Sequence, residues 1–417
     1  MKQVINLNIY SPSASSTSKN APCNISTFCD PNQCPSANSN CAYQYSYVSN
    51  DTSTSGILVE DVLHLITDDG QSKAIDAQIT FGCGQNETGI FLEGDASNGV
   101  LGLGLNDISV PSTLARQGLV PNSFSMCFGP DGTGRISFGD NGSSDQRETP
   151  FTIEPSYPTY NVSITQITIG STASKLEFYA ICNLLDSGTS YTNLRDPYYT
   201  FIAESFNSYV TEKRHLSDSQ IPFEYCYDLS ANQNVYAFPL INLTMKGGDQ
   251  YVLTNPTVTL YSNQGGGYAY CLGLLKSKDF NIIGQNFMTG YRIVFNREKM
   301  VLGWKESNLA IMRLGVPSQP TPPAEIGTAP PPDRWDRHGK AWPAGWSSCF
   351  TAWPTGWSSC FAAWPASLLR GVASGVGLSL VVAGLTGGGG YRSEKRATPW
   401  VSPWWWLRLQ AQSTTTP

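Results

Sequence analysis

The residues best suited to chemistry lie in one short stretch, 186–190, which reads Asp-Ser-Gly-Thr-Ser and follows the apolar run 181–185. A strand that ends on an acid and continues into Ser-Gly-Thr directs a carboxylate out of a tight turn. Gly188 gives that turn its backbone freedom, and the hydroxyls of Ser187, Thr189 and Ser190 can hydrogen-bond the carboxylate of Asp186. The same residues also fit an ordinary surface turn, so the rest of the chain has to decide between the two interpretations.

A second pattern, two apolar residues followed by glycine, occurs in both halves of the chain. It reads Ile-Ile-Gly at 282–284, well downstream of Asp186, and Val-Leu-Gly at 100–102. A glycine inside an apolar strand indicates that another backbone approaches closely at that point. The elements that position Asp186 are therefore expected to be short apolar strands packed tightly against one another.

The surrounding sequence predicts many short strands and few helices. Tyr43, Tyr45 and Tyr47 alternate with polar residues, and a polar turn separates them from the apolar run 57–63, which predicts a β-hairpin. Further strands are predicted at 75–83, 98–104, 123–128, 135–139, 161–169, 240–245, 268–274, 280–283, 291–295 and 300–304. Helices are predicted at 112–117 and at 196–209, the second with Asp196 as N-cap and Pro197 in its first turn. The fold class is thus an all-β pair of domains.

A proline-containing link near 150–158 divides the folded part into domains at 1–150 and 151–308. The segment 309–417 has a different character, because 317–332 is proline-rich and the residues 341–350 recur almost unchanged at 352–361. The apolar, glycine-rich run 371–385 is shorter than the ~20 residues that a membrane-spanning helix needs. We expect a disordered tail, or sequence from outside the normal reading frame, and leave membrane attachment open.

Composition and charge exclude several classes of function. The 417 residues are 40% hydrophobic and 12% aromatic, enough for a sizeable core, and only 14% are charged. A net charge of -6 gives no reason to expect a nucleic-acid partner. The three histidines, His64, His215 and His338, lie in no metal-ligand or catalytic-triad pattern. No metal and no other cofactor is expected.

Cysteines and glycosylation signals indicate an oxidising compartment. Cys23, Cys29, Cys34 and Cys41 lack Cys-x-x-Cys spacing, which favours a disulfide-stapled loop over a zinc site and leaves its connectivity open. Asn-x-Ser/Thr sequons lie at Asn24, Asn50, Asn86, Asn141, Asn161 and Asn242. Residues 1–10 do not resemble a signal peptide. We expect a protein of the secretory pathway, extracellular or vacuolar, whose natural N-terminus lies upstream of Met1.

The combination of Asp-Ser-Gly-Thr, a later apolar-apolar-Gly strand and a tyrosine-bearing hairpin resembles the pepsin-like aspartic protease family. The likeness covers about residues 1–305. Finer matches to a plant subgroup labelled aspartyl protease family protein 1-like are found in three stretches and in the four-cysteine cluster. The stretches are 6–12 (Asn-Leu-Asn-Ile-Tyr-Ser-Pro), 81–84 (Phe-Gly-Cys-Gly) and 290–297 (Gly-Tyr-Arg-Ile-Val-Phe-Asn-Arg).

The resemblance implies a bilobal fold and assigns roles to individual residues. Asp186 is a catalytic aspartate, with Gly188 and Thr189 beside it in the substrate cleft, and Tyr47 is the tyrosine of a flap that covers an extended peptide. Cys226 and Cys271 are identified as a disulfide of the second lobe, and a Cys83–Cys127 pairing is suggested. The implied partner is a peptide or protein substrate bound by a monomer, with membrane anchoring found in some family members.

The resemblance implies a mechanism with two carboxylates that share a water molecule. The ionised carboxylate takes a proton from the water, and the protonated one stabilises the oxyanion, as is well known for this pair of groups. The Asp-Ser/Thr-Gly pattern occurs once in this chain, at Asp186. We therefore expect the first lobe to be incomplete and its aspartate to lie upstream of Met1. The alternative is a catalytically inactive relative that binds peptides or other partners. Hydrolysis by this chain by itself is not expected.

Overall fold

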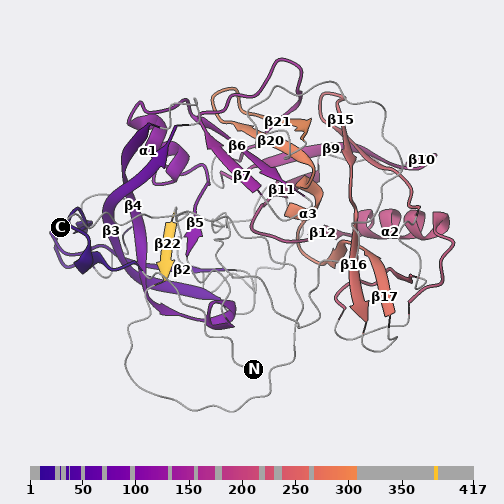
Figure 1. Cartoon of the computed structure of the whole chain (residues 1–417), viewed down its shortest axis with the longest axis horizontal. Helices are drawn as coiled ribbons and strands as arrows, with labels where there is room; N and C mark the ends of the chain where they lie inside the picture. The colour runs from indigo at the N-terminus through magenta and orange to yellow at the C-terminus, as the bar shows by residue number, and fades with distance from the viewer. Residues whose placement is uncertain are drawn as a thin grey trace, which may run out of the picture.

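The structure, a computed structural model, describes residues 10–23, 29, 34–36, 38–47, 52–67, 73–93, 99–129, 134–154, 158–173, 181–215, 221–229, 237–262, 267–307 and 380–383. Their regular structure is mainly β, arranged in sheets at either end of the molecule and joined by a central sheet (Figure 1). The expected all-β, bilobal fold class is confirmed, and the lobe that carries the earlier residues lies at the indigo-to-purple end.

The first lobe is built on a six-stranded sheet. Its strands are β1 (Lys19–Asn20), β2 (Ala42–Ser46), β3 (Ser53–Ile66), β4 (Ala74–Glu87), β5 (Val100–Leu101) and β22 (Leu380–Ala383), with 3₁₀ turns η1 (Pro12–Ala14) and η4 (Gly89–Glu93) beside them. Strand β2 pairs antiparallel with β3, as the alternating tyrosines predict, and Tyr43 and Tyr45 are buried at 3% exposure each. The predicted hairpin is therefore present.

The second lobe is built on an eight-stranded sheet. Its strands are β9 (Asn161–Ile169), β10 (Thr172–Ala173), β11 (Ile181–Leu185), β12 (Thr192–Arg195), β14 (Ile241–Met245), β15 (Gln250–Leu253), β18 (Leu274–Ser277) and β19 (Ile282–Ile283). In β14 the apolar residues Ile241, Leu243 and Met245 are buried and alternate with half-buried ones, as the period of two requires for a sheet with one face on the core. A three-stranded sheet, β13 (Cys226–Asp228), β17 (Gly267–Leu272) and β16 (Thr257–Ser262), completes this lobe.

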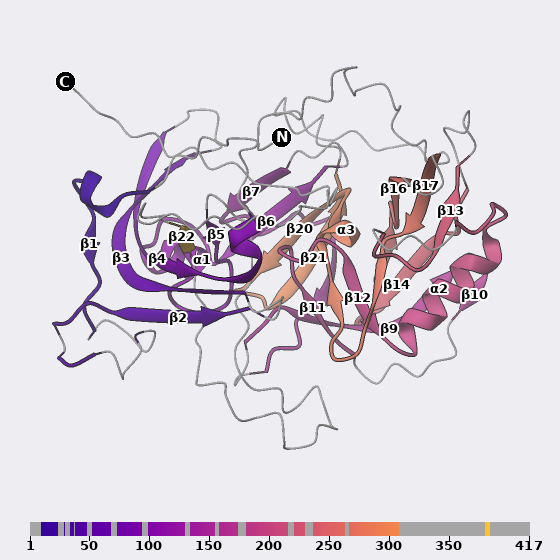
Figure 2. The ribbon, with the colours of Figure 1, turned by 90° about the horizontal axis from the view of Figure 1, so that it is seen from below.

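A five-stranded sheet joins the two lobes (Figure 2). Its order is β7 (Gly134–Phe138), β6 (Ser123–Phe128), β20 (Tyr291–Asn296), β21 (Val301–Glu306) and β8 (Arg147–Pro150). Strands β20 and β21, which come late in the chain, thus pair with strands β6 and β8 from its first half. Phe124 of β6 stacks on Phe295 of β20 with 4.7 Å between ring centroids, so the joint is apolar as well as hydrogen-bonded.

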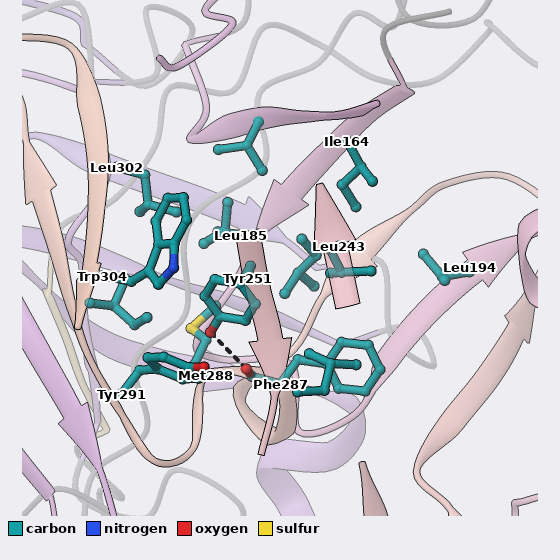
Figure 3. Packing of buried hydrophobic residues seen from close by; sticks show 14 of the residues in the cluster. Ile164, Leu185, Leu194, Leu243, Tyr251, Phe287, Met288, Tyr291, Leu302 and Trp304 are labelled. Atoms are coloured by element: carbon teal, nitrogen blue, oxygen red, sulfur yellow. Dashed lines mark hydrogen bonds between the residues drawn. The ribbon is translucent and has the colours of Figure 1, made fainter. Parts of the chain in front are cut away.

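The largest cluster of buried apolar side chains in the described part of the chain extends from the central sheet into both lobes, and Figure 3 shows part of it. Trp304 and Tyr251 are 2% and 3% exposed, and their rings lie 5.5 Å apart. Each aromatic polar atom has a partner, because the Tyr251 hydroxyl donates to the Phe287 carbonyl at 2.7 Å and Trp304 Nε1 donates to the Gln250 carbonyl at 3.2 Å. Burial raises the pKa of Tyr251 well above its usual value, which keeps that hydroxyl a donor.

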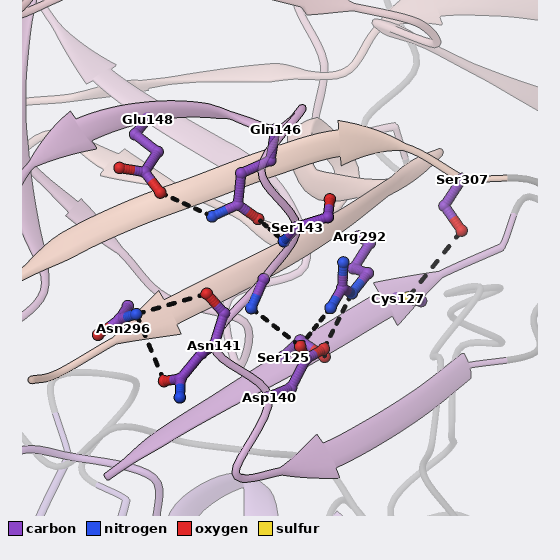
Figure 4. Close-up of polar contacts among 11 residues, drawn as sticks. Ser125, Cys127, Asp140, Asn141, Ser143, Gln146, Glu148, Arg292, Asn296 and Ser307 are labelled. Atoms are coloured by element: carbon purple, nitrogen blue, oxygen red, sulfur yellow. Dashed lines mark hydrogen bonds and ion pairs between the residues drawn. The ribbon is translucent and has the colours of Figure 1, made fainter. Parts of the chain in front are cut away.

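A half-buried ion pair crosses the central sheet beside this core (Figure 4). The Arg292 guanidinium binds both oxygens of Asp140, with its Nε donating to Oδ2 at 2.9 Å, and Ser125 and the Gly142 amide also donate to this carboxylate. Burial opposes ionisation of Asp140, but the hydrogen bonds from Arg292, Ser125 and Gly142 outweigh it and lower its pKa. The pair fixes β20, late in the sequence, to the turn after β7.

The helices agree with prediction except at their ends. Helix α1 (Val110–Arg116) begins after Ser109, whose hydroxyl accepts from the Ser112 amide. Helix α2 (Tyr198–Tyr209) begins two residues after Asp196, whose carboxylate accepts from the Thr200 amide at 3.3 Å. A short helix, α3 (Gln285–Met288), follows the Ile-Ile-Gly segment and was not predicted. In the part of the chain that the structure describes, no helix has the length and apolarity needed to cross a membrane.

Candidate active site at the Asp186 turn

The carboxylate of Asp186 is held by the turn that follows it. Asp186 Oδ1 accepts a hydrogen bond from the Gly188 amide at 2.9 Å, and Oδ2 accepts one from the Thr189 hydroxyl at 2.6 Å. The side chain is only 3% exposed. Gly188 and Thr189, which the sequence placed beside Asp186, therefore orient the carboxylate by direct contact.

The strands around this turn form a crossed arrangement. Strand β11 leads into Asp186 and pairs parallel with β19, while β12 leaves the turn and pairs antiparallel with the same β19. The two strands on either side of the Asp186 turn therefore flank β19, the Ile-Ile-Gly strand, within the sheet. The Asp186 amide donates to the Ile283 carbonyl at 3.1 Å, which places the acid at the end of that strand.

Gly284 is the point of closest approach between the two segments. A Cβ atom at this position would lie 2.6 Å from the Tyr191 carbonyl carbon, 2.8 Å from the Thr189 carbonyl oxygen and 2.9 Å from the Thr192 amide nitrogen. All three are backbone atoms of the Asp186 turn or the strand after it, so no side-chain rotation could relieve the contact. The glycine that ends the apolar-apolar-Gly pattern is thus required by the shape of the site.

Two residues that sequence reasoning missed lock this arrangement. Thr192 is fully buried, and its hydroxyl accepts from the Gly284 amide at 3.0 Å and donates to Asn286 Oδ1 at 3.1 Å. The Thr192 amide also donates to Asn286 Oδ1, at 2.9 Å. No local signal marks these two residues, because Thr192 is followed by the polar Asn193 and Asn286 is preceded by the polar Gln285.

Tyr47 lies on the other lobe, directly after β2. Its ring makes edge-to-face contacts with Tyr45, at 4.8 Å between centroids, and with Phe91, at 5.3 Å. Burial, together with the neighbouring Tyr43 and Glu87, raises the pKa of Tyr47, so its hydroxyl stays protonated. The structure brings Asp186, Gly188 and Thr189 together by hydrogen bonds and places Tyr47 at the tip of the β2–β3 hairpin.

The disulfides confirm one pairing, correct another and supply two that were open. Cys226 and Cys271 are bonded across β13 and β17, as predicted. The four-cysteine cluster forms Cys23–Cys34 and Cys29–Cys41. The suggested Cys83–Cys127 pairing is wrong, because neither Cys83, on β4, nor Cys127, on β6 of the central sheet, forms a disulfide, and each is a buried thiol. Burial raises the pKa of both thiols, which favours the unreactive protonated form.

The sequons differ in how accessible they are. Asn86 and Asn141 are exposed, Asn242 is half-buried, and Asn24 and Asn50 fall outside the described residues. Asn161 is 6% exposed, and its Nδ2, the atom that a glycan would modify, donates to the Thr159 hydroxyl at 2.7 Å. Glycosylation at these positions stays a prediction, and Asn161 is the most buried of the described sequon asparagines. Among the described side chains, no cluster of His, Cys, Asp and Glu could hold a metal ion.

Comparisons with known proteins match the two lobes separately. Residues 3–140 match the family described as Xylanase inhibitor N-terminal, and residues 159–306 match Xylanase inhibitor C-terminal. Two solved seed globulins share the fold. The basic 7S globulin of soybean is 22% identical, with a TM-score of 0.57 over 75% of this chain and 86% of its own, and lupine conglutin gamma is 21% identical, with a TM-score of 0.56 over 71% and 84%.

The curated relatives carry protease names. "Aspartyl protease family protein 1" of Arabidopsis thaliana is 53% identical over 80% of this chain, and "Aspartic proteinase-like protein 1" of the same plant is 37% identical over 72%. The chain spans 64% and 57% of the lengths of these relatives. The matches cover both lobes, and the short apolar strands around Asp186 are packed closely, as the sequence predicts. The chain belongs to the pepsin-like aspartic protease family.

Proposed function

We propose that this chain is the Asp186-bearing part of an aspartic endopeptidase. The observation that carries the proposal is the fixed carboxylate of Asp186, which accepts hydrogen bonds on both oxygens. Asp186 lies at the end of β19, the strand that pairs with β11 on one side and with β12 on the other. A carboxylate held in one orientation can take a proton from a water molecule that attacks a peptide carbonyl. The protease names of the curated relatives support the same class of reaction.

The reaction needs a second carboxylate, and the roles of the two must differ. Two carboxylates in contact cannot both ionise, so one takes the proton of the water while the other, protonated, stabilises the developing oxyanion. The Asp-Ser/Thr-Gly pattern occurs once in the 417 residues, so the partner of Asp186 has to come from sequence outside them. The substrate we propose is an extended peptide, with Tyr47 on the β2–β3 hairpin acting as the flap residue that covers it.

A second candidate is a non-hydrolytic binding protein on the same fold. It is favoured by the match of both lobes to families described by the name of an inhibitor rather than an enzyme. In that case Asp186 would serve only to hold its turn, for which burial and the bonds to Gly188 and Thr189 are sufficient. Disulfides and the accessible sequons Asn86 and Asn141 support secretion and glycosylation under either candidate.

The test compares the chain with a chimera. The segment of an active family member that carries its first Asp-Thr-Gly is joined in front of the chain, and both proteins are incubated with a peptide library at acidic pH. We expect the chimera to cleave peptides with inhibition by pepstatin, and the unextended chain to cleave none. Asp186→Asn in the chimera should abolish cleavage, whereas Asp145→Asn, at an exposed site in the turn before β8, should leave it unchanged.

Two results would count against the endopeptidase. A folded chimera that binds pepstatin weakly and cleaves nothing would favour the binding protein. Cleavage that survives Asp186→Asn would remove Asp186 from the chemistry altogether. Pepstatin-sensitive cleavage by the unextended chain would show that this chain already holds a second functional carboxylate.

A further inference from the structure

Arg297 is a buried cation with unused hydrogen-bond donors. It directly follows β20 and is only 7% exposed. Its Nη2 donates to the Leu105 carbonyl at 3.2 Å and to the Ser112 hydroxyl at 2.6 Å. A guanidinium carries N–H donors on all three nitrogens, and those of Nε and Nη1 are buried without a partner among the described residues. The side chain therefore has donors left for a group that these residues do not supply.

The described part of the chain gives Arg297 no hydrogen-bonded carboxylate. Arg292, on β20, shows the contrast, because its guanidinium binds both oxygens of Asp140. The acid next to Arg297 is engaged elsewhere, since Glu298 Oε1 accepts from the Asn122 amide at 2.9 Å. Burial takes away the water that would otherwise solvate a guanidinium, so a buried one without a counter-charge is costly. Arg297 therefore requires an acceptor, and a negatively charged one fits best.

The residues beside Arg297 also have polar atoms without partners. The Arg297 amide donates to the Asn122 carbonyl at 3.2 Å, and Ser123 pairs with Asn296 across β6 and β20. Asn122 Oδ1 and Ser123 Oγ are both buried and unpartnered. Buried polar atoms in native proteins nearly always have a partner, so several open ones on neighbouring residues indicate that a polar group from elsewhere belongs here.

The loop that binds Arg297 corresponds to the residues that hold the Asp186 turn in the second lobe. There, the residues directly after Ile-Ile-Gly donate to the turn, with the Gln285 amide 2.8 Å from one of its carbonyls. In the first lobe, Val-Leu-Gly is followed by 103–105, whose last carbonyl accepts from Arg297. A Cβ at Gly104, within this loop, would meet no atom within 4 Å. A segment that carries the aspartate turn of the first lobe would therefore pass beside Arg297.

We propose that Arg297 is a carboxylate-binding site for the segment that brings the second catalytic aspartate. An acidic side chain of that segment, distinct from the catalytic one, accepts from the open donors on Nε and Nη1 and holds the segment in place. The inference rests on the proposed function, which requires such a segment. A carboxylate fits because its bonds to a guanidinium are charge-assisted and arginine stays protonated. Residues 1–9 do not supply it, since they contain no Asp or Glu.

The test compares the full-length chain with the chimera described above, both with Asp186→Asn so that cleavage plays no part. Arg297→Met removes the charge at similar side-chain length. It should lower the thermal unfolding midpoint of the chimera by at least about 5 °C more than that of the unextended chain, because only the chimera loses a buried ion pair. Arg116→Met is the matched control. Arg116 also donates to a carbonyl and a hydroxyl but is exposed, so its loss should shift both proteins equally.

A double-mutant cycle within the chimera identifies the partner and needs no transition from the unextended chain. Each acidic residue of the added segment outside its Asp-Thr-Gly is changed singly to the amide, with Arg297 in place and in the Arg297→Met background. One of these changes should lower the midpoint when Arg297 is present and have no further effect when it is absent. Acetate and inorganic phosphate, titrated into the unextended chain, test a free anion as the ligand.

Four outcomes decide the matter. Equal effects of Arg297→Met in the two proteins, or a cycle without a coupled acidic residue, would overturn the proposal. If a free anion stabilised the unextended chain as much as the segment does, and only with Arg297 present, the segment would be excluded as the source. A chimera with Asp186 intact that cleaves peptides without depending on Arg297 would overturn this inference and leave the endopeptidase standing. Coupling without cleavage would support the inference and count against the endopeptidase.

Discussion

A Cβ atom at Gly284 would lie 2.6 Å from the carbonyl carbon of Tyr191, which means that the strand carrying Ile282 and Ile283 passes against the bare backbone of the Asp186 turn. Two hydrogen bonds close the same contact: the Gln285 amide donates to the Thr189 carbonyl at 2.8 Å, and the Asn286 amide donates to the Ser190 carbonyl at 3.1 Å. The position of the candidate catalytic carboxylate is therefore set by a backbone-to-backbone contact.

Gly284→Ala should destabilise the protein because the added methyl group meets only backbone atoms. We expect the free energy of unfolding to fall by about 1–3 kcal/mol, the usual cost of overpacking, measured by denaturant titration. The matched control is Gly267→Ala in β17, where a Cβ would meet no atom within 4 Å and the change should stay within about 0.5 kcal/mol. Equal effects at the two sites would mean that the close approach is not rigid.

Asp140→Asn should weaken the contact between the lobes. It should also make the free energy of unfolding less dependent on pH in the acidic range. The folded-state pKa of Asp140 is lowered, so its ionised form contributes stability above the ordinary carboxyl pKa of about 4, and that contribution is lost as the pH falls through the folded-state value. At neutral pH the variant should lose about 1.5–3 kcal/mol, as for hydrogen bonds to a charged group.

The control for this prediction is Asp145→Asn. Asp145 pairs with Lys305 on the same sheet, but its side chain is 63% exposed, and exposed pairs contribute little. Denaturation from pH 7 down to pH 3 should show a steeper loss of stability in the wild type and in the Asp145 variant than in the Asp140 variant. Parallel curves for all three proteins would mean that the Arg292 contact does not depend on the charge of Asp140.

Cysteine mapping should give a definite pattern. Non-reducing peptide mapping is expected to find the pairs Cys23–Cys34, Cys29–Cys41 and Cys226–Cys271. Cys83 and Cys127 should react with an alkylating reagent only after unfolding, because both thiols are buried and their pKa values are raised. A peptide that joins Cys83 to Cys127, or rapid alkylation of either in the native protein, would contradict the structure.

Much of the candidate site could be predicted because it depends on local sequence. Asp186, Gly188 and Thr189 are close in the chain, and a turn of that length brings a carboxylate and its donors together wherever it occurs. The role of Gly284 was also readable, since glycine in an apolar strand indicates a close approach. Thr192 and Asn286 could not be paired from the sequence, because their contact spans 94 positions and depends on how β12 and β19 cross.

The cysteines show the same limit. Cys226 and Cys271 were matched through a family resemblance, whereas spacing could not exclude a bond between Cys83 and Cys127. Only the tertiary structure shows that these two cysteines, on β4 and on β6, do not form a disulfide. Likewise, strands β20 and β21 were predicted as strands, but their partners β6 and β8 come from the first half of the chain, and strand pairing over such a distance leaves no local signal.

The sequence by itself determined the strand-rich class, the Asp186 turn and the family, since these depend on local patterns of turn residues, alternation and short motifs. The tertiary structure decided which strands meet. It placed the Asp186 turn around Ile282 and Ile283, and it placed Leu380–Ala383 between β4 and β5. The physical reason is that a strand can pair with any exposed sheet edge. Its partner in the folded protein is the edge whose backbone groups would otherwise be buried without hydrogen bonds.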